Sequence, residues 1–169
     1  MKPTVLIVDD EKNIRDGLRA ALEDRYETFV AKDAAEAARL MQDVPPDAVL
    51  TDLRMAGEDG MAVIDRALKL PHQPVCIMMT AYGDVETAVT AMSRGAYWFF
   101  QKPVDLRQVE LVLERGLKAR TTEKEVVTLK ARLDRKFSLG EVVGSSASLQ
   151  HSIEQVRSVA YSNATVMLL

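Results

Sequence analysis

The chain has 169 residues and a formal net charge of −3, and 47% of its residues are apolar while 28% are charged. This composition is typical of a globular protein and excludes a disordered chain. The single cysteine, Cys76, excludes a disulfide framework and fits a reducing cytoplasm. No stretch approaches the roughly 20 apolar residues of a membrane span, and the N-terminus lacks the apolar core of a signal peptide. We therefore expect a soluble, cytoplasmic protein that does not contact membranes.

Residues 1–104 alternate apolar runs of strand type with segments of helical periodicity, which predicts a parallel sheet joined by right-handed crossovers. The second run mixes polar and β-branched residues, as an edge strand does. The pattern predicts an α/β fold of the flavodoxin-like doubly wound type, with a five-stranded parallel sheet in the order 2-1-3-4-5, followed by a helical linker. The expected strands are residues 5–8, 26–31, 47–51, 75–79 and 97–100.

An apolar stripe at helical spacing lines each of the four segments between these strands, and we expect the stripes to mark the packed faces of helices. Pro45, Pro71 and Gly95 mark helix ends. Cys76, inside an apolar run, is expected to be a small buried hydrophobe rather than a reactive thiol. The stripes are Ile14, Leu18, Ala21 and Leu22; Ala34, Ala37, Ala38 and Met41; Met61, Ile64, Ala67 and Leu68; and Val85, Ala88, Val89 and Met92.

From residue 105 to about residue 135, helical signals are interrupted only by Gly116, so this segment is longer than a surface helix of a small domain requires. Five residues recur at the spacing of a short coiled-coil seam. We expect the seam to form a symmetric homodimer, with Gly116 weakening the helix and providing a place to pivot. A single solvated helix is the alternative. The seam residues are Ala119, Thr122, Val126, Leu129 and Leu133.

Positive charge is more frequent in the second part of the chain. Residues 1–104 hold 12 Lys and Arg against 17 Asp and Glu, whereas residues 105–169 hold 10 against 8. The acidic excess argues against nucleic-acid binding by the first part. In the second part acidic residues interleave with the basic ones and no recognition-helix pattern is present, so a solvated linker face is favoured over DNA binding. The basic residues are Lys118, Arg120, Lys124, Lys130, Arg132, Arg135 and Lys136.

A new unit is expected to begin after the helical pattern breaks at Phe137. Ser145, Ser146 and Ser148 are good caps for a following helix. Residues 165–169 are of buried-strand type but lack neighbours, so we interpret residues 137–169 as the opening of a further domain. We expect this segment to be less protected from hydrogen exchange than the first domain. The apolar stripe of its helix is Leu149, Ile153, Val156, Val159 and Ala160.

Polar side chains follow four of the expected strands. Asp9 and Asp10 come after the first, Asp52 after the third, Thr80 after the fourth, and Lys102 shortly after the fifth. The carboxyl edge of a parallel α/β sheet is where ligands bind, and three carboxylates meeting there repel one another unless a cation is present. Mg²⁺ is the hard, oxygen-binding ion that suits such a group.

With the metal neutralising charge, Asp52 can act as a carboxylate nucleophile toward a phosphoryl group. Thr80 can donate a hydrogen bond to one phosphoryl oxygen, and Lys102 can place a compact positive charge beside another. Taken singly, Asp10 could be only a helix N-cap, Thr80 structural and Lys102 a solvated charge. Capping explains one aspartate and not two, so the joint placement favours a functional site.

Four segments carry a resemblance to the receiver domain of bacterial two-component response regulators, covering residues 1–120. They are Val8-Asp9-Asp10-Glu11, Thr51-Asp52-Leu53-Arg54-Met55, Met79-Thr80-Ala81-Tyr82-Gly83 and Gly95 through Pro103. The resemblance implies that a sensor histidine kinase phosphorylates Asp52, and that Asp9, Asp10, Asp52 and the Arg54 carbonyl hold Mg²⁺. It also implies that Thr80 and Lys102 bind the phosphoryl group, that Phe99 is a switch aromatic, and that Lys102-Pro103 is a cis peptide.

Two positions depart from the family pattern. Ala56 stands where proline is common and is expected to loosen the loop after Asp52. Trp98 stands where an acidic or small residue is common, so we expect it either to enlarge an apolar patch or to pack on a neighbouring helix.

Residues 141–169 resemble the first segment of the AAA+ domain of sigma-54-dependent activators of the nitrogen-regulation type. The phosphate-binding loop that follows this segment in the family is absent from the 169 residues, so we expect no ATPase activity from them. The resulting hypothesis has three parts: a receiver at 1–120, a coiled-coil linker at 121–136 and an AAA+ fragment at 137–169. RNA polymerase with sigma-54 and DNA would be contacted only by parts of such activators outside this chain.

Two other functions remain as alternatives. A stand-alone receiver would act through phosphorylation-dependent protein–protein contacts. A Mg²⁺-dependent phosphatase would also form an aspartyl phosphate, but such enzymes require Asp-x-Asp after the first strand, where this chain has Asp9-Asp10-Glu11.

Overall fold

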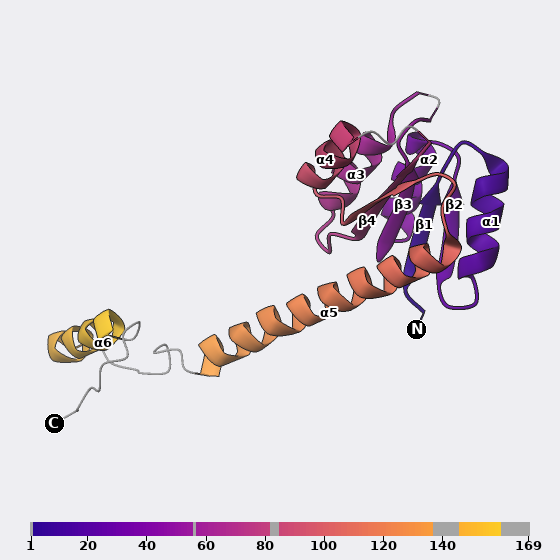
Figure 1. Cartoon of the computed structure of the whole chain (residues 1–169). Helices are drawn as coiled ribbons and strands as arrows, with labels where there is room; N and C mark the ends of the chain where they lie inside the picture. The colour runs from indigo at the N-terminus through magenta and orange to yellow at the C-terminus, as the bar shows by residue number, and fades with distance from the viewer. Residues whose placement is uncertain (1, 56, 82–84, 137–145, 160–169) are drawn as a thin grey trace. The chain divides into compact units, whose positions relative to one another are not determined.

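The computed structural model describes residues 2–55, 57–81, 85–136 and 146–159, and its elements are shown in Figure 1. Five strands alternate with helices, and a long helix and a short one follow. The elements are β1 (Thr4–Val8), α1 (Lys12–Leu22), β2 (Glu27–Ala31), α2 (Ala34–Asp43), β3 (Ala48–Asp52), α3 (Gly60–Leu68), β4 (Val75–Thr80), α4 (Val85–Ser93), β5 (Trp98–Gln101), α5 (Leu106–Lys136) and α6 (Ala147–Val159).

The five strands form one sheet in the order β2-β1-β3-β4-β5, and every neighbouring pair is parallel. This confirms the fold class and strand order expected from the alternating pattern. β2 lies at an edge, as its mixed composition predicts. β3 and β4 are central and buried along their whole length, which fits their continuous apolar sequence.

Alternating side chains of the strands supply two cores. Leu6, Val49 and Met78 face α2, α3 and α4, whereas Ile7, Leu50 and Ile77 face α1 and α5. Cys76 is buried in the first core, as predicted. Two aspartates begin helices: the Asp33 side chain accepts from the N–H of Glu36 at 2.7 Å, and that of Asp59 from the N–H of Ala62 at 3.1 Å.

The apolar stripe expected to pack in α4 is not the buried face. Val85, Val89 and Met92 are 81%, 62% and 46% exposed, while Ala91 is fully buried. A small side chain lets the helix backbone come close to the sheet, so α4 packs through alanine and presents its larger apolar side chains outward. Gly95 ends the turn after α4 with φ of 99°, as its position predicts.

The chain divides into two compact units, residues 1–123 and 124–169. α5 is helical from Leu106 to Lys136, which confirms the expected long helix. In the second unit the hydroxyl of Ser146 accepts from the N–H of Leu149 at 3.3 Å, so a predicted serine caps α6. Ala56, residues 137–145 and the expected strand at 165–169 lie outside the described residues, as do the side chains of Leu133 and Ile153. Among the described residues no helix is long and apolar enough to cross a bilayer.

Candidate functional site

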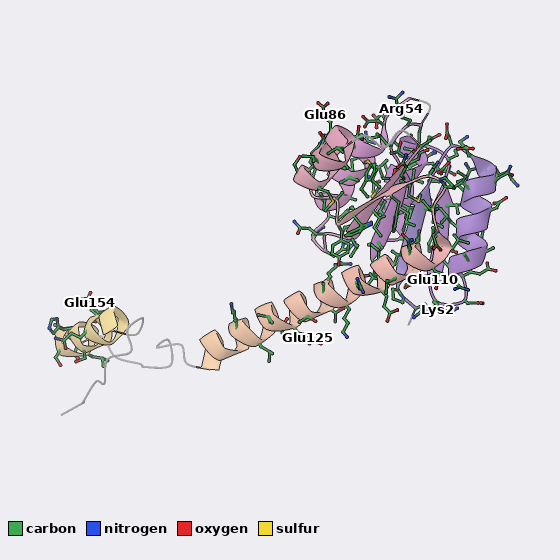
Figure 2. The ribbon with its side chains drawn as sticks, in the orientation of Figure 1. Lys2, Arg54, Glu86, Glu110, Glu125 and Glu154 are labelled. Atoms are coloured by element: carbon green, nitrogen blue, oxygen red, sulfur yellow. The ribbon has the colours of Figure 1, made fainter. Side chains whose placement is uncertain are left out.

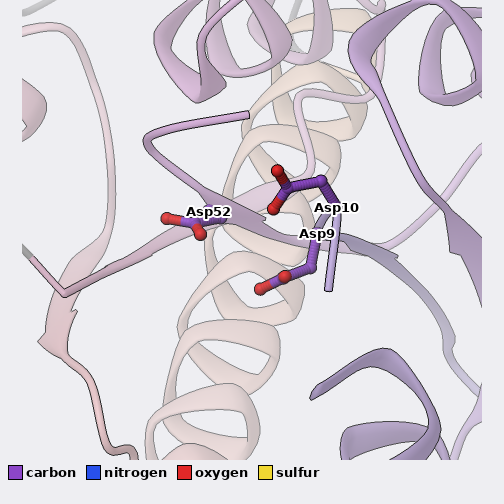
Figure 3. A group of neighbouring side chains, drawn as sticks. All are labelled: Asp9, Asp10 and Asp52. Carbon is purple, nitrogen blue, oxygen red and sulfur yellow. The ribbon is translucent and has the colours of Figure 1, made fainter. Parts of the chain in front are cut away.

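The structure brings the strand-end carboxylates together at the carboxyl edge of the sheet. Asp9 follows β1 and Asp52 ends β3, and one carboxylate oxygen from each of Asp9, Asp10 and Asp52 lies within 4.8 Å of the others. Figure 3 shows the side chains of Asp9 and Asp10, which follow β1, near that of Asp52 at the end of β3. Asp9 and Asp52 are buried and Asp10 is exposed, so the group opens to solvent on one side. Figure 2 places Arg54 and Glu86 at this end of the domain and Lys2 at the other.

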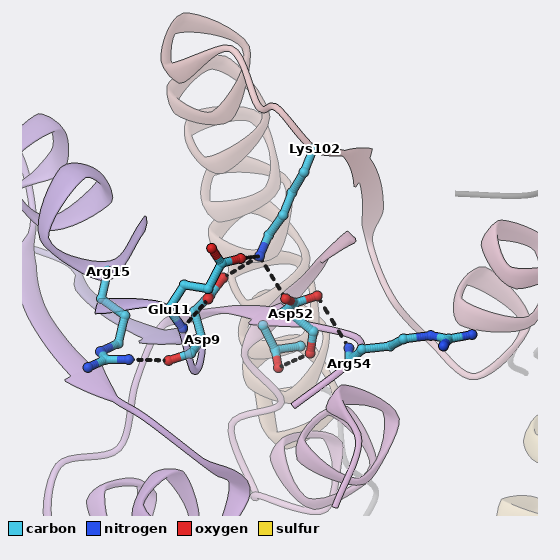
Figure 4. A network of polar contacts seen from close by, with 7 residues as sticks. Asp9, Glu11, Arg15, Asp52, Arg54 and Lys102 are labelled. Atoms are coloured by element: carbon cyan, nitrogen blue, oxygen red, sulfur yellow. Dashed lines mark hydrogen bonds and ion pairs between the residues drawn. The ribbon is translucent and has the colours of Figure 1, made fainter. Parts of the chain in front are cut away.

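Lys102 is the cation of this cluster. Its Nζ lies 2.7 Å from Oδ2 of Asp9, 2.7 Å from Oδ2 of Asp52 and 3.6 Å from Oε1 of Glu11, as Figure 4 shows. Its side chain is only 9% exposed. The peptide between Lys102 and Pro103 is cis, as the resemblance implies. The backbone N–H of Lys102 donates to the carbonyl of Thr80 at 2.8 Å, which fixes the loop beside the end of β4.

Burial and charge act against each other in this cluster. Burial raises the pKa of Asp9, although hydrogen bonds from Lys102 and from the backbone N–H of Glu11 oppose the rise. Burial lowers the pKa of Lys102, but hydrogen bonds to Asp52 and Asp9 outweigh it and the net pKa is raised. Lys102 is therefore held as an ammonium at neutral pH and acts as the internal counter-cation of two buried carboxyl groups.

Backbone contacts orient Asp52. Its Oδ1 accepts from the N–H of Arg54 at 3.3 Å, and its carbonyl accepts from the Thr51 hydroxyl at 3.0 Å. Gly60, the first residue of α3, packs on the same carbonyl so closely that a Cβ there would overlap the oxygen. Sequence reasoning did not single out Gly60 as a site residue. Its signal was present, since a glycine stood at the end of the loop after Asp52.

The donor set suits a divalent ion. Three carboxylates offer hard oxygen ligands from one side of a pocket that stays partly open to water, which is the combination Mg²⁺ favours. The alternative that Asp10 is only a helix cap is wrong, because the N-cap of α1 is Glu11 and no side chain caps it. The carboxylate of Asp10 is thus placed with Asp9 and Asp52 rather than used by the helix.

The other predicted site residues lie on β4 and β5. Thr80 ends β4 and is fully buried, and Phe99 is half-buried on β5 opposite Met78. Trp98 is 46% exposed, with its ring centroid 6.4 Å from that of Phe100. Trp98 lies two residues before Phe100 on β5, so it is on the side of the sheet that α1 and α5 cover, whereas Phe99 packs on the side that α4 covers.

A doubly wound parallel sheet whose carboxyl edge carries an acidic cluster around one lysine defines a class of phosphoryl-accepting domains. The family model described as the response regulator receiver domain matches residues 5–114. The chain belongs to this family.

Relatives extend the similarity past the receiver. The regulatory protein AtoC of Escherichia coli is 33% identical over 165 residues, covering 97% of this chain and 36% of that protein. The C4-dicarboxylate transport transcriptional regulatory protein DctD of Pseudomonas aeruginosa is 33% identical over 167 residues, covering 98% of this chain and 36% of that protein. The chain thus spans about a third of the length of these curated relatives.

Solved structures agree with the fold. The crystal structure of NtrX from Brucella abortus superposes with a TM-score of 0.72 at 34% identity, covering 97% of this chain and 36% of that one. The solution structure of the beryllofluoride-activated NtrC4 receiver domain dimer gives a TM-score of 0.65 at 32% identity, covering 69% of this chain and 98% of that one.

Proposed function

We propose that this chain is the phosphorylation-controlled input part of a transcription regulator, in which a sensor histidine kinase transfers a phosphoryl group to Asp52. The observation that carries the proposal is the pair of buried carboxyl groups, Asp9 and Asp52, bridged by the nearly buried ammonium of Lys102. A buried nucleophile with an adjacent cation and a possible metal site has what phosphoryl transfer requires, namely positioning and charge stabilisation.

In the proposed reaction, an oxygen of Asp52 forms the O–P bond while the N–P bond of the phosphohistidine breaks and the imidazole leaves. Asp9, Asp10, Asp52 and the Arg54 carbonyl would hold Mg²⁺, which supplies positive charge to the transferred oxygens when bound. Lys102 and the Thr80 hydroxyl bind phosphoryl oxygens. The ammonium needs only a short shift, because it already contacts Asp52 at 2.7 Å.

The phosphoryl group changes the charge at the ends of β3 and β4 and biases a two-state surface that includes Thr80 and Phe99. Phe99 is half-buried, so its ring has room to move between a more buried and a more exposed position. The signal then passes to α5 and the linker.

We assign residues 1–120 to the receiver, 121–136 to the linker and 137–169 to the start of an AAA+ domain of a sigma-54-dependent activator. Support comes from relatives with regulatory names that align over 97–98% of this chain, including its last fifty residues. RNA polymerase with sigma-54 and DNA would be partners of the remaining two thirds of such a protein. A homodimer through α5 and the linker is consistent with a receiver-domain dimer among the similar structures.

Intact-mass measurement after incubation with acetyl phosphate and Mg²⁺ tests the proposal. We expect one added phosphoryl group in the natural chain and in Asp24→Asn, a control at an exposed aspartate. Asp52→Asn should not be labelled. Undiminished labelling of Asp52→Asn would show that another residue is the acceptor.

A second candidate is a stand-alone receiver that signals by protein–protein contact. The exposed Val85, Val89 and Met92 favour it, since they leave large apolar side chains of α4 open to a protein partner without need of a further domain. A nucleotide-binding loop in the protein sequence that follows residue 169 would favour the sigma-54-dependent activator over the stand-alone receiver.

A further inference from the structure

The guanidinium of Arg120 ties α5 to the amino edge of the sheet, at the end opposite the acidic cluster. One terminal nitrogen donates to the carbonyl of Asp47 at 2.9 Å and lies 3.4 Å from its carboxylate, and the other donates to the carbonyl of His72 at 2.6 Å. The side chain is only 13% exposed. Arg120 therefore does not belong to the solvated basic face that its sequence neighbourhood predicts.

Asp47 joins the starts of three strands. Its N–H donates to the carbonyl of Thr4 at 2.8 Å, its carboxylate accepts from the N–H of Thr4 at 3.0 Å, and its carbonyl accepts from the N–H of Val75 at 2.9 Å. The strands that begin here are β1, β3 and β4. These same strands lead at their other ends to Asp9, Asp52 and Thr80, so Arg120 binds the far ends of the elements that carry the site.

One turn earlier, α5 is held by close packing. A Cβ on Gly116 would lie 2.7 Å from Cγ1 of Val75 and 3.0 Å from Cε1 of Tyr97. One and two residues after Arg120, the hydroxyls of Thr121 and Thr122 donate to carbonyls of their own helix. Among the described side chains of α5, Arg120 is thus the last one hydrogen-bonded to another element of the receiver, just before the first compact unit ends at Glu123.

One donor of the Arg120 guanidinium lacks a hydrogen bond in the part of the chain that the structure describes. The Nε–H of Arg120 is buried without a hydrogen-bond partner among the described residues. An unpaired buried donor has a free-energy cost, which brings the bound state closer to a released one.

We propose that Arg120 is a positioning residue that couples the strands bearing the phosphorylation site to the helix that leaves the receiver. The inference rests on the proposed function, since it takes phosphorylation of Asp52 as the input. A change at the carboxyl ends of β3 and β4 shifts the loops at Asp47 and His72, and Arg120 transmits that shift to α5.

The test compares Arg120→Met with Arg115→Met in the whole chain. Methionine keeps an unbranched apolar stem but removes every donor, and Arg115 is an exposed arginine on the same helix. Two quantities are measured with and without acetyl phosphate and Mg²⁺: the mass added at Asp52, and amide hydrogen exchange over residues 124–136. Exchange in β1 reports global stability separately.

We expect equal labelling of the natural chain and both variants. In the natural chain and Arg115→Met, phosphorylation should change the rates of amide hydrogen exchange in the linker about tenfold. This is the size of effect expected when a hydrogen bond to a charged group is lost. In Arg120→Met the linker should exchange equally with and without phosphodonor, while β1 stays protected. Arg120→Lys keeps one charged donor group and should restore part of the response; it serves as the deciding variant should Arg120→Met fail to fold.

An unchanged linker response in the labelled Arg120 variants would overturn the coupling. So would a labelled natural chain whose linker does not respond at all. Absence of labelling in the natural chain would instead overturn the proposed function, and the coupling with it.

Discussion

The ammonium of Lys102 lies 2.7 Å from Oδ2 of Asp52, although the two residues are 50 positions apart in the chain. Their side chains are 9% and 8% exposed. The contact joins the loop after β5 to the end of β3 and holds the proposed acceptor against an internal cation. Before any metal or phosphoryl group arrives, the charge balance of the site is one ammonium against the three carboxyl groups of Asp9, Asp10 and Asp52, which leaves an acidic excess for a metal ion to neutralise.

Removing that cation tests the balance. Lys102→Met leaves Asp9 and Asp52 buried without their partner, and breaking a buried ion pair from one side costs about 3 kcal/mol. We expect urea unfolding without Mg²⁺ to show a loss of this order, and saturating Mg²⁺ to recover more stability in the variant than in the natural chain. Lys118→Met, at an exposed position of α5, is the control. Equal urea midpoints for Lys102→Met and the natural chain would mean that the ion pair contributes nothing to the free energy of unfolding.

Gly116 was expected to be a pivot that weakens α5, but the structure gives it a packing role. Alanine improves helix propensity by about 1 kcal/mol, whereas the Cβ would press on Val75 and Tyr97, and overpacking costs about 1–3 kcal/mol. We expect Gly116→Ala to be destabilised by about 1 kcal/mol in urea unfolding. Val75→Ala in the same chain should relieve part of the clash.

Gly17 in α1 is the matched control for this prediction, because nothing lies within 4 Å of a Cβ added there. Gly17→Ala should therefore be stabilised by up to about 1 kcal/mol. A gain of the same size at Gly116 would show that α5 shifts freely to accept the methyl group.

Burial raises the pKa of Cys76 to about 12, from an ordinary value of 9.0. As pH rises, the thiol therefore ionises in the unfolded chain before it ionises in the folded one. The contribution of the buried neutral thiol to the free energy of unfolding is fully present below about pH 9 and is lost between about pH 9 and 12. Between about pH 8 and 10 we expect the natural chain to lose about 1.4 kcal/mol more stability than Cys76→Ala. Parallel curves of unfolding free energy against pH for the two chains would contradict a buried neutral thiol.

The linker seam predicts a homodimer. Val126 and Leu129 are 44% and 56% exposed, and each gives on the order of 1.5–3 kcal/mol when fully covered, set against several kcal/mol of association entropy. We expect Leu129→Glu with Leu133→Glu to be monomeric in sedimentation while still accepting phosphate at Asp52. A natural chain that sediments as a monomer at concentrations of tens of micromolar, with and without phosphodonor, would make the linker a lone helix.

The sequence by itself determined the architecture and the membership of the acidic cluster. Strand and helix periodicities are local, so the bounds of the five strands were located to within one residue, and the alternation of types implied parallel crossovers and one carboxyl edge. Because that edge collects all strand ends, Asp9, Asp10, Asp52, Thr80 and Lys102 could be assigned to one site before any distance was known.

Only the tertiary structure decided which surfaces are used. The apolar stripe on α4 does not tell whether that face of the helix packs on the sheet or faces solvent. In the structure Ala91 is the buried residue, and Val85 and Val89 are exposed. Gly116 reads as a weak helix position until Val75, 41 positions earlier, is found against it. Arg120 reads as one cation among seven until Asp47 accepts its hydrogen bond. Each of these roles depends on a neighbour far along the chain, and periodicity carries no information about such neighbours.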